Sequence, residues 1–92
     1  MPLYAVTIRI TAVPEEAFPA LQAQEKRFLE MKSAGRIRLA GRLGEEDGFL
    51  AVFEAKDILD ARATAEGFPL IRGGVASWSL RAFDELFRRR SD

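Results

Sequence analysis

A carboxylate, Glu25, lies in a segment that otherwise reads as the apolar side of a helix. In "LQAQEKRFLE", one apolar stripe contains Leu21, Phe28 and Leu29. Glu25 falls inside this stripe and Gln24 lies on its flank. The 92-residue chain has no histidine and no cysteine, so proton transfer must use a carboxylate, Lys, Tyr or a bound water. Because enclosure against an apolar sheet strengthens a carboxylate as a base, Glu25 is the candidate acid/base.

Each candidate residue also has a purely structural interpretation. Glu25 can lie at the edge of the stripe and reach solvent or a neighbouring arginine. Tyr4 shares one side of a predicted strand with Val6 and Ile8, so its hydroxyl can polarise a substrate oxygen. Alternatively, Tyr4 is a core residue whose hydroxyl lies at the rim. Trp78 is expected in the core, with a pocket wall as its alternative role.

Composition excludes several other kinds of site. Without cysteine and histidine the chain lacks disulfides, thiolate nucleophiles, the usual haem ligand and the commonest zinc ligand, and we expect no metal and no cofactor. The net charge of zero argues against nucleic-acid binding. The basic run 88–90 is expected to be a solvated tail, with an anionic contact as the lesser option. No apolar run is long enough for a membrane and no signal peptide precedes the first strand, so we expect no membrane contact and a cytoplasmic protein.

Alternating and periodic apolar residues predict four strands and two helices. The strands are expected at 3–11, 36–43, 49–55 and 75–83. The first helix is expected from about 19 to 34, because Pro19 suits a first turn and Gly35 suits a left-handed C-cap. A shorter helix follows Asp57 and ends at Glu66. The remaining segments are read as a turn, a glycine turn, a loop, and a short helix or frayed tail: 14–18, 44–48, 68–74 and 84–90.

The order β-α-β-β-α-β is the ferredoxin-like arrangement of an α+β fold, in a single domain over 1–92. The expected strand order is 4-1-3-2, with an antiparallel sheet and both helices on one face. This order places the two most apolar strands in the centre. The residues expected in the core are Ile8, Phe18, Leu21, Phe28, Ile37, Val52, Phe53 and Trp78.

The second face of the sheet also needs a cover. Alternation in the second strand predicts apolar residues on one face and arginines on the other: Ile37, Leu39 and Leu43 against Arg36, Arg38 and Arg42. The first strand adds Thr7 and Arg9 to the arginine face, the fourth strand adds Ser77, Ser79 and Arg81, and the third strand adds apolar residues. This face is too mixed for a core and too apolar at its centre to stay wet. We therefore expect a homodimer in which two sheets pack into a barrel, or a larger homo-oligomer.

Five short motifs keep one register along nearly the whole chain: Ala23-Gln24-Glu25-Lys26, Gly35, Arg42, Val52-Phe53-Glu54 and Phe68-Pro69-Leu70. In this register the chain resembles the dimeric α/β-barrel superfamily, and within it the muconolactone isomerase family. The chain departs from the family pattern at Gly41, where a Trp is usual, and at Arg72, where a second Pro is usual. Both departures touch the expected pocket.

The resemblance implies a small-molecule isomerase that transfers a proton without a cofactor on a carboxylated or lactone-like substrate. Isomerising an unsaturated lactone moves a proton between two carbons, and Glu25 would take and return it. Arg42 would hold the substrate carboxylate. Glu25 favours a pocket between helix and sheet, although Arg42 is predicted on the opposite face. The implied site consists of Glu25 and Tyr4 as catalytic residues, with Arg42, Trp78, Gln24 and Phe68 binding the substrate.

The YciI-like family is the nearest rival. The segment "MKSAGRIRLAG" is similar to the end of its first helix and its second strand. The presumed catalytic pair of that family is a His on the first helix and an Asp before a Pro, and the corresponding residues here are Gln24 and Phe68. As a YciI relative, this chain would be a non-catalytic ligand-binding or oligomerisation module.

Overall fold

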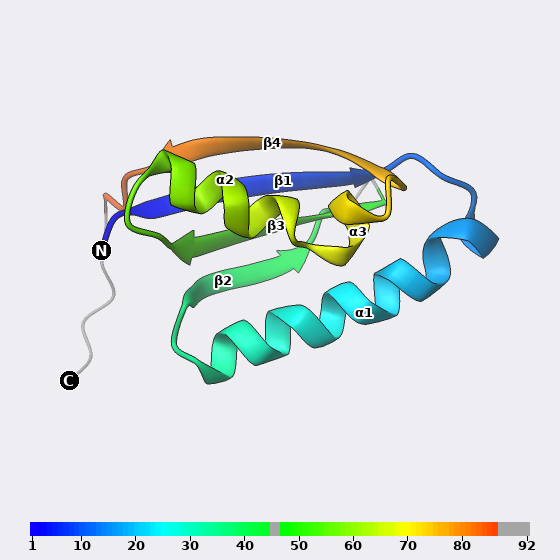
Figure 1. Ribbon diagram of the computed structural model, residues 1–92, viewed down its shortest axis with the longest axis horizontal. Helices are drawn as coiled ribbons and strands as arrows, with labels where there is room; N and C mark the ends of the chain where they lie inside the picture. Colours follow the sequence, from blue (N-terminus) through cyan, green and yellow to red (C-terminus); the bar gives the residue numbers. More distant parts are fainter. Residues whose placement is uncertain (45–46, 87–92) are drawn as a thin grey trace.

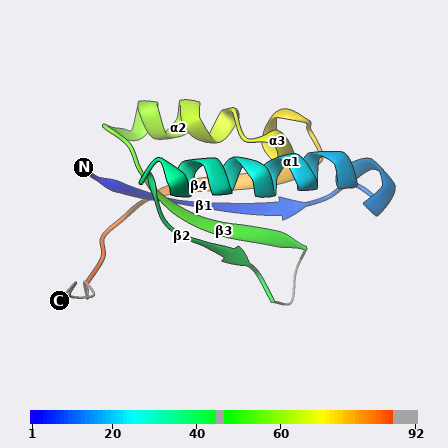
Figure 2. The same ribbon diagram turned by 90° about the horizontal axis from the view of Figure 1, so that it is seen from below.

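The computed structural model in Figure 1 describes residues 1–44 and 47–86. Its elements are β1 (Leu3–Ile10), α1 (Pro14–Ser33), β2 (Ile37–Arg42), β3 (Gly48–Glu54), α2 (Ile58–Glu66), α3 (Pro69–Arg72) and β4 (Ala76–Phe83). The strands form one antiparallel sheet in the order β2-β3-β1-β4. Figure 2 shows the three helices on one face of this sheet. The ferredoxin-like arrangement and the strand order are confirmed.

The first helix begins earlier than expected. It starts at Pro14, with Glu15 and Glu16 in its first turn, and includes Pro19. Proline at position 19 removes only the hydrogen bond to the carbonyl of Glu15, close to an end where several groups lack helical partners anyway. At the other end Gly35 has φ of 72°, so the predicted left-handed residue is confirmed.

The second half of the chain also differs from expectation in one place. Asp57 caps α2 by accepting a hydrogen bond from the Asp60 N–H at 2.8 Å, as predicted. The segment expected as a loop contains the short helix α3, which begins at Pro69 because proline suits a first helical position. The parts of the expected glycine turn and tail at 45–46 and 87–90, including the basic run, lie outside the described residues.

The buried face of α1 lies one residue earlier than the sequence suggested. Gln24, Phe28 and Met31 are buried, whereas Leu29 is 64% exposed. One residue corresponds to about 100° of rotation around a helix. Gln24 therefore occupies the apolar face to which the sequence had assigned Glu25.

Four aromatic rings form the centre of the core between the helices and the sheet. Phe28 of α1 meets the ring of Phe49 at 5.7 Å and that of Phe68 at 5.5 Å, and Phe68 meets Phe53 at 5.9 Å. All three contacts have the edge-to-face geometry that aromatic pairs prefer. The rings fasten α1 and the start of α3 to the central strand β3.

The predicted core is confirmed in most positions. Ile8, Phe28 and Phe53 are buried in this core, and Leu21, Ile37 and Trp78 are partly buried against it. Val52 is also buried, but it lies on the other face of the sheet and outside this cluster. Phe18 is 55% exposed, so its assignment to the core was wrong. The early start of α1 places Phe18 in its first turns, beyond the aromatic cluster.

A β-bulge changes which side chains of β2 face the helices. Ile37 pairs with Phe53, but Leu39 pairs with Val52, so the register shifts between them. A bulge of one residue reverses the alternation that follows it. Arg42 therefore pairs with Phe49 on the helix-covered face. The expectation that Leu39 shares a face with Ile37, and Arg42 the opposite one, was wrong.

The other face of the sheet, called here the open face, is covered by no helix among the described residues. It carries Ala5, Thr7, Arg9, Leu39, Leu50, Val52, Ser77, Ser79 and Arg81. At one end the chain after β4 passes beneath the sheet (Figure 2). There Glu85 lies 3.9 Å from Arg38, so the segment after β4 contacts the opposite edge strand, β2.

Phe28→Ala tests whether the aromatic cluster fastens α1. The variant should lose about 3–5 kcal/mol of the free energy of unfolding, because a buried ring leaves a cavity when removed. Chemical denaturation measures the loss. Leu29→Ala, on the exposed side of the same helix, should change stability by less than about 0.5 kcal/mol. Equal losses for the two variants would contradict this packing.

Candidate functional site

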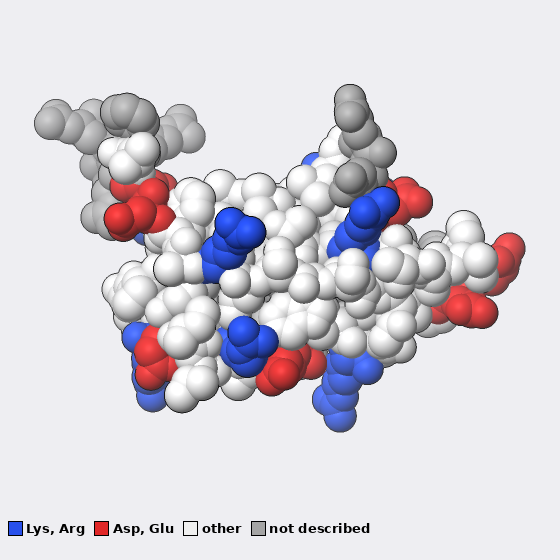
Figure 3. Space-filling model, turned by 90° about the horizontal axis from the view of Figure 1, so that it is seen from above, with Lys and Arg blue, Asp and Glu red and all other residues white. Residues whose placement is uncertain are grey.

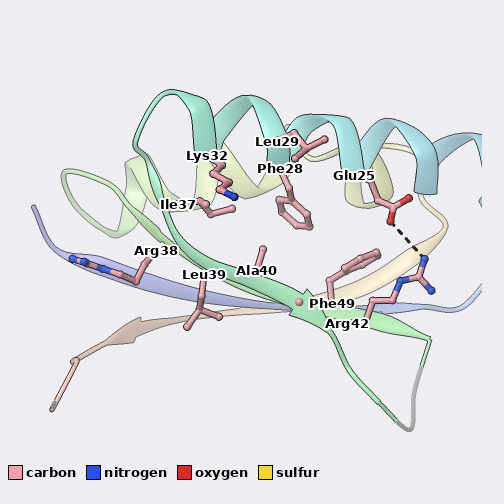
Figure 4. A pocket seen from close by; sticks show the side chains of 11 residues that line it. Glu25, Phe28, Leu29, Lys32, Ile37, Arg38, Leu39, Ala40, Arg42 and Phe49 are labelled. Carbon is pink, nitrogen blue, oxygen red and sulfur yellow. Dashed lines mark ion pairs between the residues drawn. The ribbon is translucent and has the colours of Figure 1, made fainter. Parts of the chain in front are cut away.

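A cleft of about 600 Å³ lies between α1 and the edge strand β2. Figure 4 shows its side chains, which come from α1 above and from β2 and β3 below. Apolar groups dominate the middle and charged groups stand at its ends. The lining residues are Glu25, Phe28, Leu29, Lys32, Ile37, Arg38, Leu39, Ala40, Gly41, Arg42 and Phe49.

Glu25 and Arg42 meet at one end of this cleft. Arg42 Nη2 lies 3.6 Å from Glu25 Oε2, and the Arg42 guanidinium carbon lies 5.6 Å from the ring centroid of Phe49. The two charged side chains are 51% exposed for Glu25 and 66% exposed for Arg42. Glu25 is therefore at the edge of the helix and on an arginine, and the expected enclosure in apolar surroundings does not occur in the free protein.

The charges around the cleft favour an anionic ligand. Its lining contains three cationic residues, Lys32, Arg38 and Arg42, and one carboxylate, Glu25. Arg38 is paired with Glu85, which is not part of the lining, so Lys32 and Arg42 are the cations that face a ligand. Arg42 can bind a carboxylate through two parallel N–H groups, which fixes the orientation of the ligand. A ligand bound in this way would place its apolar part against Phe28 and Phe49, with Glu25 beside it.

Arg42 and Phe49 also line a second depression, of about 400 Å³. This depression lies beside the start of α1 and includes Phe18 and Leu21 in its lining. Phe18, which the sequence placed in the core, thus forms part of an exposed wall.

Gln24 is fully buried and does not line the cleft. Its Oε1 accepts a hydrogen bond of 3.2 Å from the Leu70 N–H, at the second position of α3. Phe68, the residue before α3, makes no side-chain capping hydrogen bond. Gln24, which belongs to α1, instead accepts the hydrogen bond from a free N–H group in the first turn of α3. Gln24 Nε2 is buried without a hydrogen-bond partner among the described residues.

The other predicted site residues lie away from Glu25. Phe68 is buried in the aromatic cluster. Trp78 is on β4 beneath the Arg62 guanidinium, which lies 5.6 Å from the centroid of its ring. Tyr4 lines a different depression, near the start of β1 and the end of β4.

The sheet register shows how far Tyr4 lies from the cleft end that holds Arg42. Tyr4 pairs with Phe53, whereas Arg42 pairs with Phe49. Those two partners are four residues apart on β3, which is about 13 Å along a strand. The structure therefore brings together Glu25 and Arg42 alone from the predicted set.

The sequence analysis did not identify Lys32 as a cleft residue, and it assigned Arg42 to the wrong face of the sheet. Lys32 follows Glu25 by about two helical turns and lines the same cleft, so the periodicity of α1 could have identified it. The face of Arg42 depends on the bulge in β2, for which the sequence carries no distinctive turn residue.

Figure 3 shows the side of the molecule where β4 forms the sheet edge. Lys and Arg side chains are scattered singly there, with acidic side chains and wide uncharged areas between them. On this side the described residues form no continuous basic patch of the kind that binds nucleic acid. Within 1–44 and 47–86, no helix is both long and apolar enough to cross a membrane.

Comparison with known proteins identifies the fold and not the activity. No protein-family model matches the chain, and no curated protein matches it in sequence. A solved structure of muconolactone isomerase superposes with a TM-score of 0.75, at 15% identity, over 98% of this chain and 97% of that one. The resemblance to muconolactone isomerase noted from the sequence is thus confirmed at the level of fold.

Two further solved structures share this fold. One is 5-chloro-2-hydroxyhydroquinone dehydrochlorinase from Burkholderia phenoliruptrix AC1100, in complex with 2,5-dihydroxybenzoquinone. It gives a TM-score of 0.73 at 12% identity, over 89% of this chain and 93% of its own. The other, MtbAldR, gives 0.65 at 14% identity, and this chain spans 59% of its length. Muconolactone isomerase and the dehydrochlorinase, which share this fold, both carry the names of enzymes.

Gln24→Ala tests whether Gln24 is a structural tether. The variant should lose about 2–4 kcal/mol of unfolding free energy, because it leaves a cavity and an unbonded Leu70 N–H. Gln22→Ala, on the exposed side of the same helix, should be nearly neutral. Urea denaturation of both variants measures the difference. A loss at Gln24 as small as that at Gln22 would contradict the tether.

Proposed function

We propose that this protein is a small-molecule enzyme of the isomerase type, which transfers a proton on a carboxylated or lactone-like substrate without a cofactor. The observation that carries the proposal is the contact between Glu25 and Arg42 at 3.6 Å, at the end of an apolar cleft. One residue can bind an anion and the other can move a proton. The fold that this chain shares with muconolactone isomerase and the dehydrochlorinase supports the proposal that it is an enzyme acting on small molecules.

The chemistry requires Arg42 to exchange its partner. The substrate carboxylate binds the Arg42 guanidinium and releases Glu25 from it, while the unsaturated part of the substrate lies against Phe28 and Phe49. Glu25 then removes a proton from one carbon, the electron pair shifts the double bond, and Glu25 returns the proton to a second carbon. The bound substrate excludes water from Glu25, which makes the carboxylate a stronger base during the reaction.

Glu25→Gln tests the proton transfer. The amide keeps the shape of the side chain but cannot accept the proton, so kcat should fall by about two to four orders of magnitude. The measurement is a screen of unsaturated lactones and carboxylic acids, followed by kinetics on the substrate found. Folding should be retained, because an exposed ion pair contributes little to stability.

Glu30→Gln is the matched control for this experiment. Glu30 lies on the same helix, outside the cleft, in an exposed pair with Arg27 at 3.9 Å. Its replacement changes the charge of α1 by the same amount and should leave kcat unchanged. Equal activity of the Glu25 and Glu30 variants would contradict a catalytic role for Glu25.

A non-catalytic ligand-binding module of the YciI-like kind is the alternative function. The observation that favours it is the burial of Gln24 and Phe68, the residues at the positions of the YciI-like catalytic pair. Gln24 accepts a hydrogen bond from α3, and Phe68 packs in the aromatic cluster. If this alternative is correct, a carboxylic acid should bind in the cleft without turnover. Glu25→Gln would then leave both binding and stability nearly unchanged.

We also propose that the open face of the sheet packs against a second copy of the chain. Leu39 is 46% exposed on this face, and Leu50 lies partly buried near its centre. Arg9 and Arg81 lie around this apolar centre, which suits a polar rim of a sheet-to-sheet interface. A homodimer, or a larger homo-oligomer, would cover the apolar centre.

Leu50→Glu tests this assembly. A carboxylate at the centre of a sheet interface would be buried without a partner, so a dimeric wild type should become monomeric in light scattering. Leu59→Glu on α2 is the control, because Leu59 is exposed on the helix side and should leave the dimer intact. A wild-type monomer at micromolar concentration would contradict the proposal.

A further inference from the structure

Lys32 stands at the opposite end of the cleft from the Glu25–Arg42 pair. It follows Glu25 on α1 by about 10 Å along the helix axis. Figure 4 shows Lys32 near Ile37 at one end, Glu25 and Arg42 at the other, and Phe28, Ala40 and Phe49 between them. The cleft therefore has a cationic group at each end and an apolar middle.

Among the cationic side chains of the cleft, Lys32 is the one without an ion pair to any described residue. Arg42 contacts Glu25 at 3.6 Å, and Arg38 contacts Glu85 at 3.9 Å. Lys32 makes no ion pair with any residue in 1–44 or 47–86. Its location in the last turn of α1 complements the helix dipole, which is a structural role open to a lysine at this place.

We infer that the cleft selects an elongated dianion, with one carboxylate on Arg42 and a second anionic group on Lys32. This inference extends the proposed function, which requires only the carboxylate on Arg42. The two sites differ in kind. Arg42 has a planar fork that fixes one end of the ligand, whereas Lys32 is a point charge on a flexible stem. The Lys32 side chain can therefore reach the second anionic group of ligands that differ somewhat in length, while Arg42 holds the first carboxylate in a fixed position beside Glu25.

The apolar middle restricts what joins the two anionic groups. The side chains in the middle of the cleft are all apolar and could not form hydrogen bonds or ion pairs with a polar linker: Phe28, Ile37, Ala40 and Phe49. A ligand with a hydrocarbon or flat unsaturated centre loses little hydration there and buries apolar surface. The ligand class is thus a dicarboxylate, or a carboxylate with a second acidic group, joined by an apolar segment several carbon atoms long.

Calorimetric titration with linear dicarboxylates from succinate to suberate tests the inference. The monomethyl ester of each acid is the matched ligand, because it has nearly the same shape and one charge fewer. The proteins are the wild type, Lys32→Met, and Lys56→Met as the control. Methionine keeps the apolar stem and removes the charge, and Lys56 is exposed and lies outside the cleft.

The diacid of best length should bind the wild type and Lys56→Met about tenfold more tightly than its ester, the effect of one charged hydrogen bond. Lys32→Met should bind the two equally. A purely structural Lys32 would lower stability in denaturant melts without changing this ratio. Equal binding of diacid and ester by the wild type, a preference that survives in Lys32→Met, or no binding of any diacid would each overturn the inference.

Arg42→Met separates this inference from the proposed function. If Arg42 holds the first carboxylate, the monoester should lose affinity in Arg42→Met but keep it in Lys32→Met. Monoester binding that is independent of Arg42 would contradict the carboxylate role in the proposed function. A diacid preference lost only in Lys32→Met would still support the second anionic site.

Discussion

The β-bulge in β2 is the constraint on which the candidate site depends. Up to Ile37 the strand presents the residues that simple alternation predicts, and after the bulge it presents the other set. Arg42 thereby comes to the helix-covered face, where it meets Glu25 and the ring of Phe49. Without the bulge its side chain would lie on the open face, separated from Glu25 by the sheet. Bulges commonly redirect side chains at sheet edges in this way, and β2 is an edge strand.

The aromatic cluster and Gln24 then set the height and rotation of α1 above the strand. Phe28 packs against both Phe49 and Phe68, and Gln24 binds the Leu70 N–H. Because neighbouring residues on a helix differ by about 100° in direction, burial of Gln24 turns Glu25 outward to the cleft. A polar residue in the core thus decides the direction of the candidate base beside it.

The sequence predicts the fold well because strand alternation, Gly35 and the cap at Asp57 all agree with one arrangement. It predicts Glu25 and Arg42 as partners in one site only through the family resemblance. Alternation alone separates them, because a bulge reverses the faces without requiring a distinctive residue type. The burial of Gln24 also could not be predicted from the sequence. Its hydrogen-bond partner is a backbone N–H on α3, which is distant in the sequence and lies in a segment expected to be a loop.

The exposure of the Glu25–Arg42 pair suits a site that is completed by its ligand. An ion pair between side chains that are half-exposed or more contributes about 0–1 kcal/mol, so a carboxylate ligand can take the place of Glu25 on Arg42 at little cost. A buried pair would resist this exchange, because separating its charges leaves one of them desolvated and unpaired. The free protein thus holds Glu25 at the end of the cleft without enclosing it. In the proposed reaction, the substrate that occupies the cleft would complete the enclosure of Glu25.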